Sequence, residues 1–222
     1  MSSRPRRQSN TATPNSSATS TKDNAAYTLS KKRELFACGG AFFFQTGVPG
    51  AFGPQLWEPC QVAVPGPQTT VCCGANFTLS VDEHGHVYQW GIDADEVVRV
   101  PTKVAGLQRP IVAIACGRKH SLAMTDKNEV FSWGLGTSGQ LGHGDAPMSP
   151  IIRPKQINCL KDRHRDPPGK IFAGGNTSGI VTKNNLPLLW GSNKFGQVRY
   201  RCASPYCTTP PKSNNRLCDC ST

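Results

Sequence analysis

The sequence contains no long hydrophobic run. Its longest uninterrupted apolar segment is Ile111–Cys116, whereas a helix that spans a bilayer needs about 20 residues. No apolar segment follows the arginines near the N-terminus, so the pattern of a secretory signal peptide is also missing. We therefore expect an intracellular protein, in the nucleus or cytoplasm, that makes no membrane contact. Its ten Cys are then reduced thiols, because intracellular compartments rarely sustain structural disulfides.

The common signatures of catalysis are absent as well. There is no Gly-rich phosphate loop followed by Lys and Ser or Thr, no Gly-x-Ser-x-Gly elbow and no recognisable carboxylate pair. Residues Gly134–Gly139 spell a G-x-G-x-x-G string, but they follow an expected strand and open no helix, which argues against a dinucleotide site. We expect no catalytic residue and no cofactor, and hence a protein that is not an enzyme.

Charged residues are scarce, at 18%, and they are unevenly placed. Residues 1–33 hold seven Lys and Arg against one Asp and contain no Val, Ile, Phe or Trp, which predicts a disordered basic tail. Clustered Lys and Arg attract phosphate without reading sequence, so this tail is a candidate for contact with chromatin or nucleic acid. A solubilising tail or a split nuclear import signal would explain the same residues. The candidate nucleic-acid-binding residues are Arg4, Arg6, Arg7, Lys31, Lys32 and Arg33.

Three segments of the chain align without a gap, which reveals an internal repeat. They read CGANFTLSVDEHGHVYQWG from Cys73, CGRKHSLAMTDKNEVFSWG from Cys116 and AGGNTSGIVTKNNLPLLWG from Ala173. The intervals between their Trp residues are 43 and 57, and such periods are typical of propellers and solenoids. Leu35–Gly39 fits as an earlier copy of the Trp-Gly end.

Each copy has the pattern of a β-hairpin. Alternate positions from Phe77 to Val81 are apolar, which is the period of a strand. The turn that follows holds Gly85, Asn128 or Asn185 in the three copies, residue types that tolerate a positive φ. An apolar strand before the hairpin, such as Ile111–Cys116, completes one propeller blade.

These units predict an all-β fold, a partial β-propeller of about three to four blades. We expect the blades over residues 34–200, after the basic tail of residues 1–33 and before an irregular Cys-containing tail at residues 201–222.

The copies resemble the repeat of the regulator of chromosome condensation family. The matching residues are Cys116–Gly117, His120–Ala123, Val130–Gly134 and Gly139–Asp145. The resemblance implies a propeller that acts through its surfaces and loops. Its best-known member is an exchange factor for a small GTPase that is also held on nucleosomes, and other members are docking modules.

Several positions depart from the family pattern. The segment from Trp90 to Val104 lacks the Gly-Gln-Leu-Gly turn that follows Trp133. The substituted positions are Cys38 for Trp, Phe77 and Thr177 for His, Gly179 for a core Leu, and Pro187 within a strand, where we expect an edge.

The resemblance covers too few blades to close the family's ring of seven. Open strand edges invite association, so we expect a homo-oligomer, a protein partner that covers the edges, or a truncated product. The function hypothesis is a non-enzymatic module for protein–protein interaction, with regulation of a small GTPase as its sharper form. The alternatives are a pure scaffold or truncated paralogue without exchange activity, and an electrostatic chromatin binder.

Two groups are candidate sites. The acidic residues Asp93, Asp95 and Glu96 could contact a partner such as a GTPase, or form a solvated connection between strands. Four C-terminal cysteines could bind zinc, or belong to an irregular tail. They are Cys202, Cys207, Cys218 and Cys220.

Three histidines have simpler interpretations. His120 is expected to make a buried structural contact rather than to act in catalysis, because no nucleophile or second ligand accompanies it. His84 and His86 lie in and beside an expected hairpin turn near Asp82, which accounts for them without a metal.

Overall fold

The computed structural model describes residues 25–50, 55–93, 96–161, 164–196, 198 and 206–207. These residues form four antiparallel sheets, each of which continues directly from the one before it in the chain. Each sheet is a propeller blade, which confirms the predicted all-β partial propeller.

The blades are defined here by their strands. Blade 1 holds β1 (Ala25–Leu29), β2 (Leu35–Gly40) and β3 (Gln55–Gln61). Blade 2 holds β4 (Gln68–Cys73), β5 (Phe77–Asp82), β6 (Val87–Asp93) and β7 (Glu96–Lys103). Blade 3 holds β8 (Ile111–Cys116), β9 (His120–Thr125), β10 (Val130–Gly134) and β11 (Ile151–Gln156). Blade 4 holds β12 (Pro168–Gly174), β13 (Thr177–Thr182), β14 (Pro187–Ser192) and β15 (Tyr206–Cys207).

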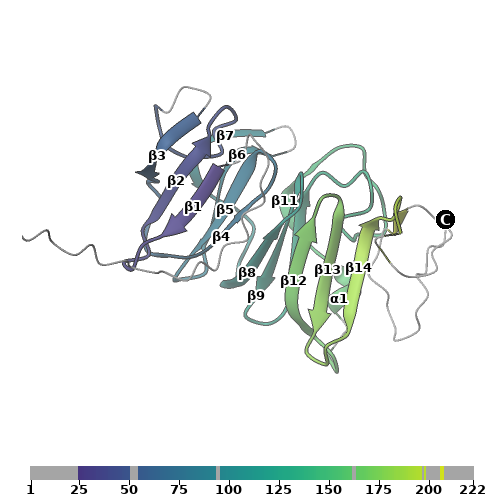
Figure 1. Ribbon diagram of the computed structural model, residues 1–222. Helices are drawn as coiled ribbons and strands as arrows, with labels where there is room; N and C mark the ends of the chain where they lie inside the picture. The colour runs from purple at the N-terminus through teal and green to yellow at the C-terminus, as the bar shows by residue number, and fades with distance from the viewer. Residues whose placement is uncertain are drawn as a thin grey trace, which may run out of the picture.

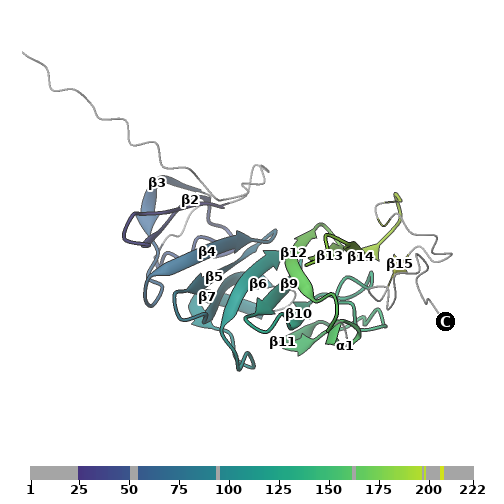
Figure 2. The ribbon, with the colours of Figure 1, turned by 90° about the horizontal axis from the view of Figure 1, so that it is seen from below.

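The blades stand side by side in chain order. Figures 1 and 2 show the array running from the purple blade 1 to the yellow-green blade 4, and the two end blades do not meet in either view. A short helix, α1 (Asn158–Lys161), links blade 3 to blade 4. No helix in the described part of the chain has the length and apolar character needed to span a bilayer.

The first strand begins earlier than the sequence indicated. We expected a disordered tail as far as residue 33, but β1 begins at Ala25 and pairs with β2 from Ala25↔Gly39 to Leu29↔Leu35. Tyr27 and Leu29 pack against the core between blades 1 and 2. Two apolar side chains are too few for β1 to be recognised as a strand within a polar, basic stretch of sequence. They are nevertheless enough to anchor β1 to the core.

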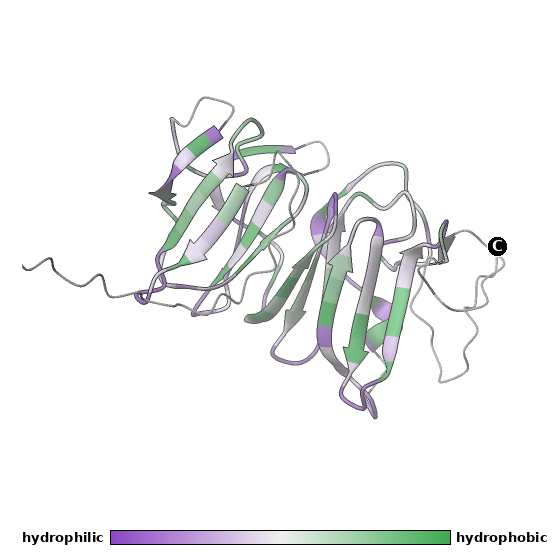
Figure 3. Ribbon diagram, viewed as in Figure 1, coloured by the Kyte–Doolittle hydropathy of each residue, from purple (hydrophilic) through white to green (hydrophobic). Residues whose placement is uncertain are grey.

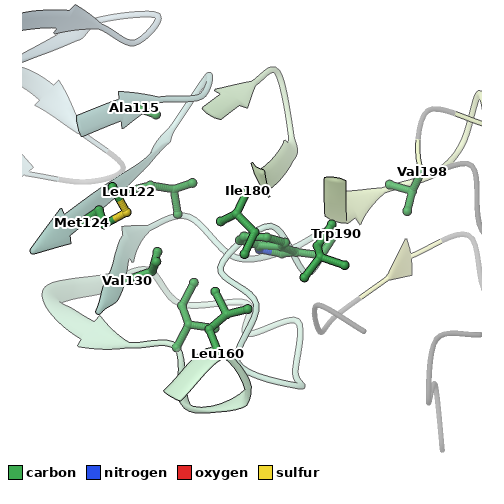
Figure 4. Close-up of a cluster of buried hydrophobic side chains, with 10 residues drawn as sticks. Ala115, Leu122, Met124, Val130, Leu160, Ile180, Trp190 and Val198 are labelled. Carbon is green, nitrogen blue, oxygen red and sulfur yellow. The ribbon is translucent and has the colours of Figure 1, made fainter. Parts of the chain in front are cut away.

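The hydrophobic cores lie between the blades. Each contains the buried Trp of the later blade, packed on apolar side chains of the earlier one: Trp90, Trp133 and Trp190 are all at most 1% exposed. Figure 4 shows Trp190 and Ile180 of blade 4 facing Leu122 and Val130 of blade 3. Burying an aromatic side chain of this size is among the largest apolar contributions to stability.

Two departures from the family pattern find a structural reason in blade 4. Gly179 replaces the core Leu, and the ring of Phe172 from β12 lies directly over it, so that a Cβ at Gly179 would come within 2.2 Å of that ring. Phe172 therefore covers the space of the missing side chain. Pro187 is not on an edge strand as we expected, because β14 lies between β13 and β15. It is the first residue of its strand, a position that proline tolerates.

Candidate partner-binding face

A turn closes the junction between blades 1 and 2, and an equivalent turn closes the junction between blades 3 and 4. Trp90 Nε1 donates to the backbone carbonyl of Gln45 at 2.8 Å, and Trp190 Nε1 donates to the backbone carbonyl of Gln140 at 2.9 Å. The two glutamines have equivalent positions in the repeat. Gln45 lies seven residues after Cys38 of the Cys-Gly pair in blade 1, and Gln140 lies seven residues after Trp133 of the Trp-Gly pair in blade 3. The turn in blade 1 was missed in the sequence, although a Gln-x-Gly seven residues after Cys38 was its signal.

Both turns need glycine beside the indole. Gly47 and Gly142 have φ values of 67° and 75°, and a Cβ at either would lie 2.7 Å from the indole nitrogen of the next blade. The residues before the two glutamines, Phe44 and Gly139, also have a positive φ, of 58° and 76°. The turn geometry is therefore shared even where the sequence is not.

A hydroxyl joins each Trp at these carbonyls. Ser178 Oγ donates to the carbonyl of Gln140 at 2.7 Å and lies 2.7 Å from His120 Nε2. Because the single hydroxyl proton goes to Gln140, the imidazole donates to the serine. Burial lowers the pKa of His120 to about 4, so this histidine is neutral at physiological pH. His120 thus makes a buried contact between blades 3 and 4, as its predicted structural role requires.

Between blades 1 and 2, the side chain of Tyr27 reaches the Gln45 carbonyl from β1 of the earlier blade, as His120 reaches Ser178 from the earlier blade at the other junction. Its hydroxyl donates to the carbonyl of Gln45 and lies 3.0 Å from Thr78 Oγ1. Burial raises the pKa of Tyr27, so the phenol stays protonated and acts as a donor.

The junction between blades 2 and 3 has no such turn. Here β6 and β7 pair as far as Asp93↔Glu96, which leaves two residues between the strands. Trp133 Nε1 donates instead to the side chain of Gln89, at 3.0 Å from Oε1, and Gln89 Nε2 donates to Asp93 Oδ2 at 3.0 Å. Ser121 occupies the position of Thr78 and Ser178, and its buried hydroxyl has no hydrogen-bond partner among the described residues.

A cavity of about 550 Å³ opens where the turn is missing. We call it the junction pocket. Blade 2 contributes a polar wall and blade 3 a largely apolar one, and the described lining residues include no Lys, Arg or His. Its lining residues are Gln89, Asp93, Glu96, Gly134, Ser149, Pro150, Ile151 and Ile152.

Exposed apolar side chains gather at the same end of the blades, the end from which the turns project, drawn at the top in Figure 1. We call this end the turn face. It carries seven of the ten large apolar side chains that are exposed in the described part of the chain, either on turns or near the starts of the outer strands. They are Phe42, Phe43, Trp57, Val97, Met148, Ile152 and Phe195. We call the opposite end of the blades the hairpin end. Its loops in blades 3 and 4 are purple, hence hydrophilic, in Figure 3.

The acidic residues predicted to contact a partner separate in the structure. Glu96 is exposed at the start of β7 and lines the junction pocket. Asp93 differs from the expectation of a surface residue: it is only 5% exposed and holds Gln89 in place beneath Trp133. Asp95 lies outside the described residues.

The predicted basic residues lie at the hairpin end where the structure describes them. Lys31, Lys32 and Arg33 form the exposed turn between β1 and β2, and Arg33 lies 3.7 Å from Glu83. Arg4, Arg6 and Arg7 lie outside the described residues.

The predicted zinc ligands cannot be assembled from the described residues. Cys207 ends β15, and Cys202, Cys218 and Cys220 lie outside the described part.

Asp82 organises the hairpin turn that contains His84 and His86. Its Oδ1 accepts from the backbone nitrogens of both histidines, at 2.9 and 2.8 Å, and its Oδ2 lies 2.9 Å from His86 Nδ1. Burial acts to raise the pKa of Asp82, but the hydrogen bonds from His86 and His84 outweigh it and the pKa is lowered. Within the described ranges, no group of three or more His, Cys, Asp or Glu is placed to hold a metal.

Comparison with known sequences identifies the repeat. A model of the regulator of chromosome condensation (RCC1) repeat matches residues 84–124 and 127–181, and a second model of this repeat matches residues 111–140. Residues 84–181 are therefore built from RCC1-type repeats. Alsin from Homo sapiens and from Rattus norvegicus is 36% identical to it over 77 residues, which is 35% of this chain and 4% of Alsin.

Solved structures confirm the RCC1-type β-propeller fold. Human WBSCR16 superposes with a TM-score of 0.73 at 20% identity, over 84% of this chain and 50% of that one. Yeast RCC1 (Prp20), solved bound to Kap60, superposes with a TM-score of 0.71 at 20% identity, over 84% of this chain and 46% of that one. The chain thus spans about half the length of these propellers.

Proposed function

We propose that this RCC1-repeat protein is a non-enzymatic interaction module that binds a partner protein through its turn face. The observation that carries the proposal is that exposed apolar side chains share this end of all four blades, from Phe42 in blade 1, 65% exposed, to Phe195 in blade 4, 90% exposed. Exposed apolar side chains that gather on one surface mark interaction sites. Aromatic residues in particular are enriched at protein interfaces.

Affinity capture with matched variants tests this proposal. Phe42→Ser combined with Phe195→Ser removes two exposed rings without touching a core, so the fold is retained. Val112→Ser is the control, because Val112 is 57% exposed near the start of β8, toward the hairpin end. Partners enriched by the wild-type chain and by Val112→Ser should be lost from the double variant. Equal capture by all three chains would refute binding through the turn face.

Regulation of a small GTPase is the sharper form of this function. Its support is the RCC1 repeat itself together with the exposed carboxylate of Glu96, which could compete for the cationic surroundings of a bound nucleotide. Release of a fluorescent GDP analogue from purified candidate GTPases is the test. Acceleration by the wild-type chain that Glu96→Gln reduces would support exchange. Binding of a GTPase without acceleration would leave a docking module.

The hairpin end supports a separate electrostatic contact with nucleic acid. Lys31, Lys32 and Arg33 are exposed there, away from the turn face. Clustered cations of this kind bind phosphate in a salt-dependent way. A steep loss of DNA binding with added salt, weakened by Lys31→Ala with Lys32→Ala, is the expected result.

A further inference from the structure

We propose that the junction pocket binds one basic side chain of the partner protein, an arginine flanked by apolar residues. The proposal rests on the proposed function in that it takes the partner to be a protein. It adds the position of the contact and the chemistry that is recognised.

The pocket exists because one turn of the repeat is missing. Between blades 3 and 4 the turn after Trp133 fills the equivalent space, and its Leu141 is fully buried. Between blades 2 and 3 no described residue takes that place, and Gln89 supplies only the hydrogen-bond acceptor for Trp133. The junction is therefore closed in its core but hollow at the turn face.

The two walls of the pocket differ in chemistry. Asp93 and Glu96 supply carboxylates on the blade 2 side, and Pro150, Ile151 and Ile152 supply apolar contact on the blade 3 side. The hydrogen bond from Gln89 fixes the orientation of the Asp93 carboxylate. A Cβ at Gly134 would lie 3.4 Å from Asp93 Oδ1, so this carboxylate reaches the end of β10 in blade 3.

Charge and shape together favour arginine. A long aliphatic stem with a terminal cation can pack on the apolar wall while its head meets the carboxylates. The planar guanidinium matches carboxylate geometry better than an ammonium does. No Lys, Arg or His is found among the described residues that line the pocket, so the acidic side chains of Asp93 and Glu96 set the sign of the charge in this lining. A cavity of about 550 Å³ also exceeds what one side chain fills, so the neighbouring apolar residues of the partner can enter with it.

The indole signals of the full chain provide a direct readout. The chain has four Trp, and the Trp133 indole is bonded to Gln89, a lining residue. Acetyl-Leu-Arg-Leu-amide titrated into the ¹⁵N-labelled protein at low salt should shift the Trp133 indole N–H signal saturably. The Trp90 and Trp190 signals should stay in place. The same peptide with citrulline, which is neutral and nearly isosteric with arginine, should bind at least about tenfold more weakly because the charge-assisted hydrogen bonds are lost.

Variants separate the pocket from other acidic surfaces. Glu96→Gln should weaken binding of the arginine peptide about tenfold, and Glu96→Lys should abolish it by placing a cation in the pocket. Glu58→Gln is the matched control, because Glu58 is an exposed glutamate on β3 of blade 1, and it should bind as the wild type does. Equal binding of the arginine and citrulline peptides, or equal binding by Glu96→Gln and wild type, would overturn the proposal. So would a peptide that leaves the Trp133 signal unmoved.

The two proposals fail in different ways. If no peptide binds while the Phe42 and Phe195 variant still loses its partners, the turn face stands and the basic ligand is wrong. If the arginine peptide binds while partner capture is insensitive to those rings, the pocket stands and the wider binding face is wrong.

Discussion

The indole of Trp133 donates to the side chain of Gln89, whereas the indoles of Trp90 and Trp190 donate to backbone carbonyls. A backbone carbonyl can accept from the indole only where the whole turn that carries it is present. A side-chain amide can accept from the indole when a single residue on a neighbouring strand supplies it. The exchange lets the protein omit a turn between blades 2 and 3 without leaving a buried indole nitrogen unpaired. The hollow in the turn face is a direct result.

Gln89→Ala should therefore destabilise the protein. It removes the acceptor of the Trp133 indole and the donor to Asp93 at once, and leaving buried polar groups unpaired costs about 1–3 kcal/mol. Urea unfolding followed by Trp fluorescence measures the change. The matched control is Gln156→Ala, since Gln156 makes one long contact of 3.5 Å with Glu129, and it should change stability by less than about 0.5 kcal/mol. Equal stabilities for the two variants would contradict this role of Gln89.

Gly142→Ala should destabilise far more than Gly66→Ala. Both glycines have a positive φ, of 75° and 71°, so alanine is strained at either position. Only at Gly142 would the new Cβ also meet an indole, at 2.7 Å from Trp190 Nε1, whereas nothing lies within 4 Å of it at Gly66. We expect about 1 kcal/mol at Gly66 and at least about 2 kcal/mol more at Gly142, because overpacking in a core is added to the backbone strain. Thermal unfolding of the two variants checks the difference.

The neutral state of His120 predicts an acid-sensitive stability. Burial lowers its pKa in the folded protein to about 4, below the value of about 6.5 in an unfolded chain, so the unfolded state takes up the proton first as the pH falls. The stability is complete above about pH 6.5 and falls by roughly 1.4 kcal/mol per pH unit toward pH 4. Burial also lowers the pKa of the partly buried His143 to about 4, which adds a smaller effect of the same sign.

His120→Phe should flatten this dependence. Phe is the residue that blade 2 already carries at the same place, as Phe77. The variant cannot take up a proton, so denaturant midpoints measured at pH 7 and pH 5 should differ less than they do for the wild-type chain. Identical pH profiles for the two chains would show that His120 is not the buried group responsible.

Gly179→Leu should destabilise the protein, and Phe172→Ala should rescue it. A side chain at Gly179 collides with the Phe172 ring, while blade 3 shows that the reversed pair, Ala115 opposite Leu122, is compatible with the same sheet. The double variant should be more stable than the sum of the single changes by at least about 1 kcal/mol, as expected for residues in contact. Additive effects in the double-mutant cycle would mean that the two residues do not share one space.

The blades could be predicted from sequence because their determinants are local. Alternating apolar residues, a turn residue with a positive φ and a terminal Trp-Gly recur at fixed spacing, and the family resemblance reinforced them. The buried role of His120 followed in the same way. These features depend little on which residues lie in the neighbouring blade.

The candidate site depended on contacts between blades, which a single sequence does not display. Asp93 belongs to an acidic run and was expected at the surface, but the missing turn brings it beneath Trp133. The turn around Gln45 was missed because only its Gln and Gly match the family. The junction pocket arises from residues that are absent, so only the stacking of blades 2 and 3 could reveal it.

The hydrogen bonds of the three buried Trp lock the junctions between the blades, and they define both the turn face and the junction pocket. Hydrogen exchange of the four indole N–H groups in the full chain, assigned by single Trp→Phe variants, tests them in one measurement. Trp57 is 83% exposed and should exchange at once, whereas Trp90, Trp133 and Trp190 should be protected by their bonds across the junctions. Rapid exchange of all four would mean that the blades do not stack as described, and the proposed binding face would fall with them.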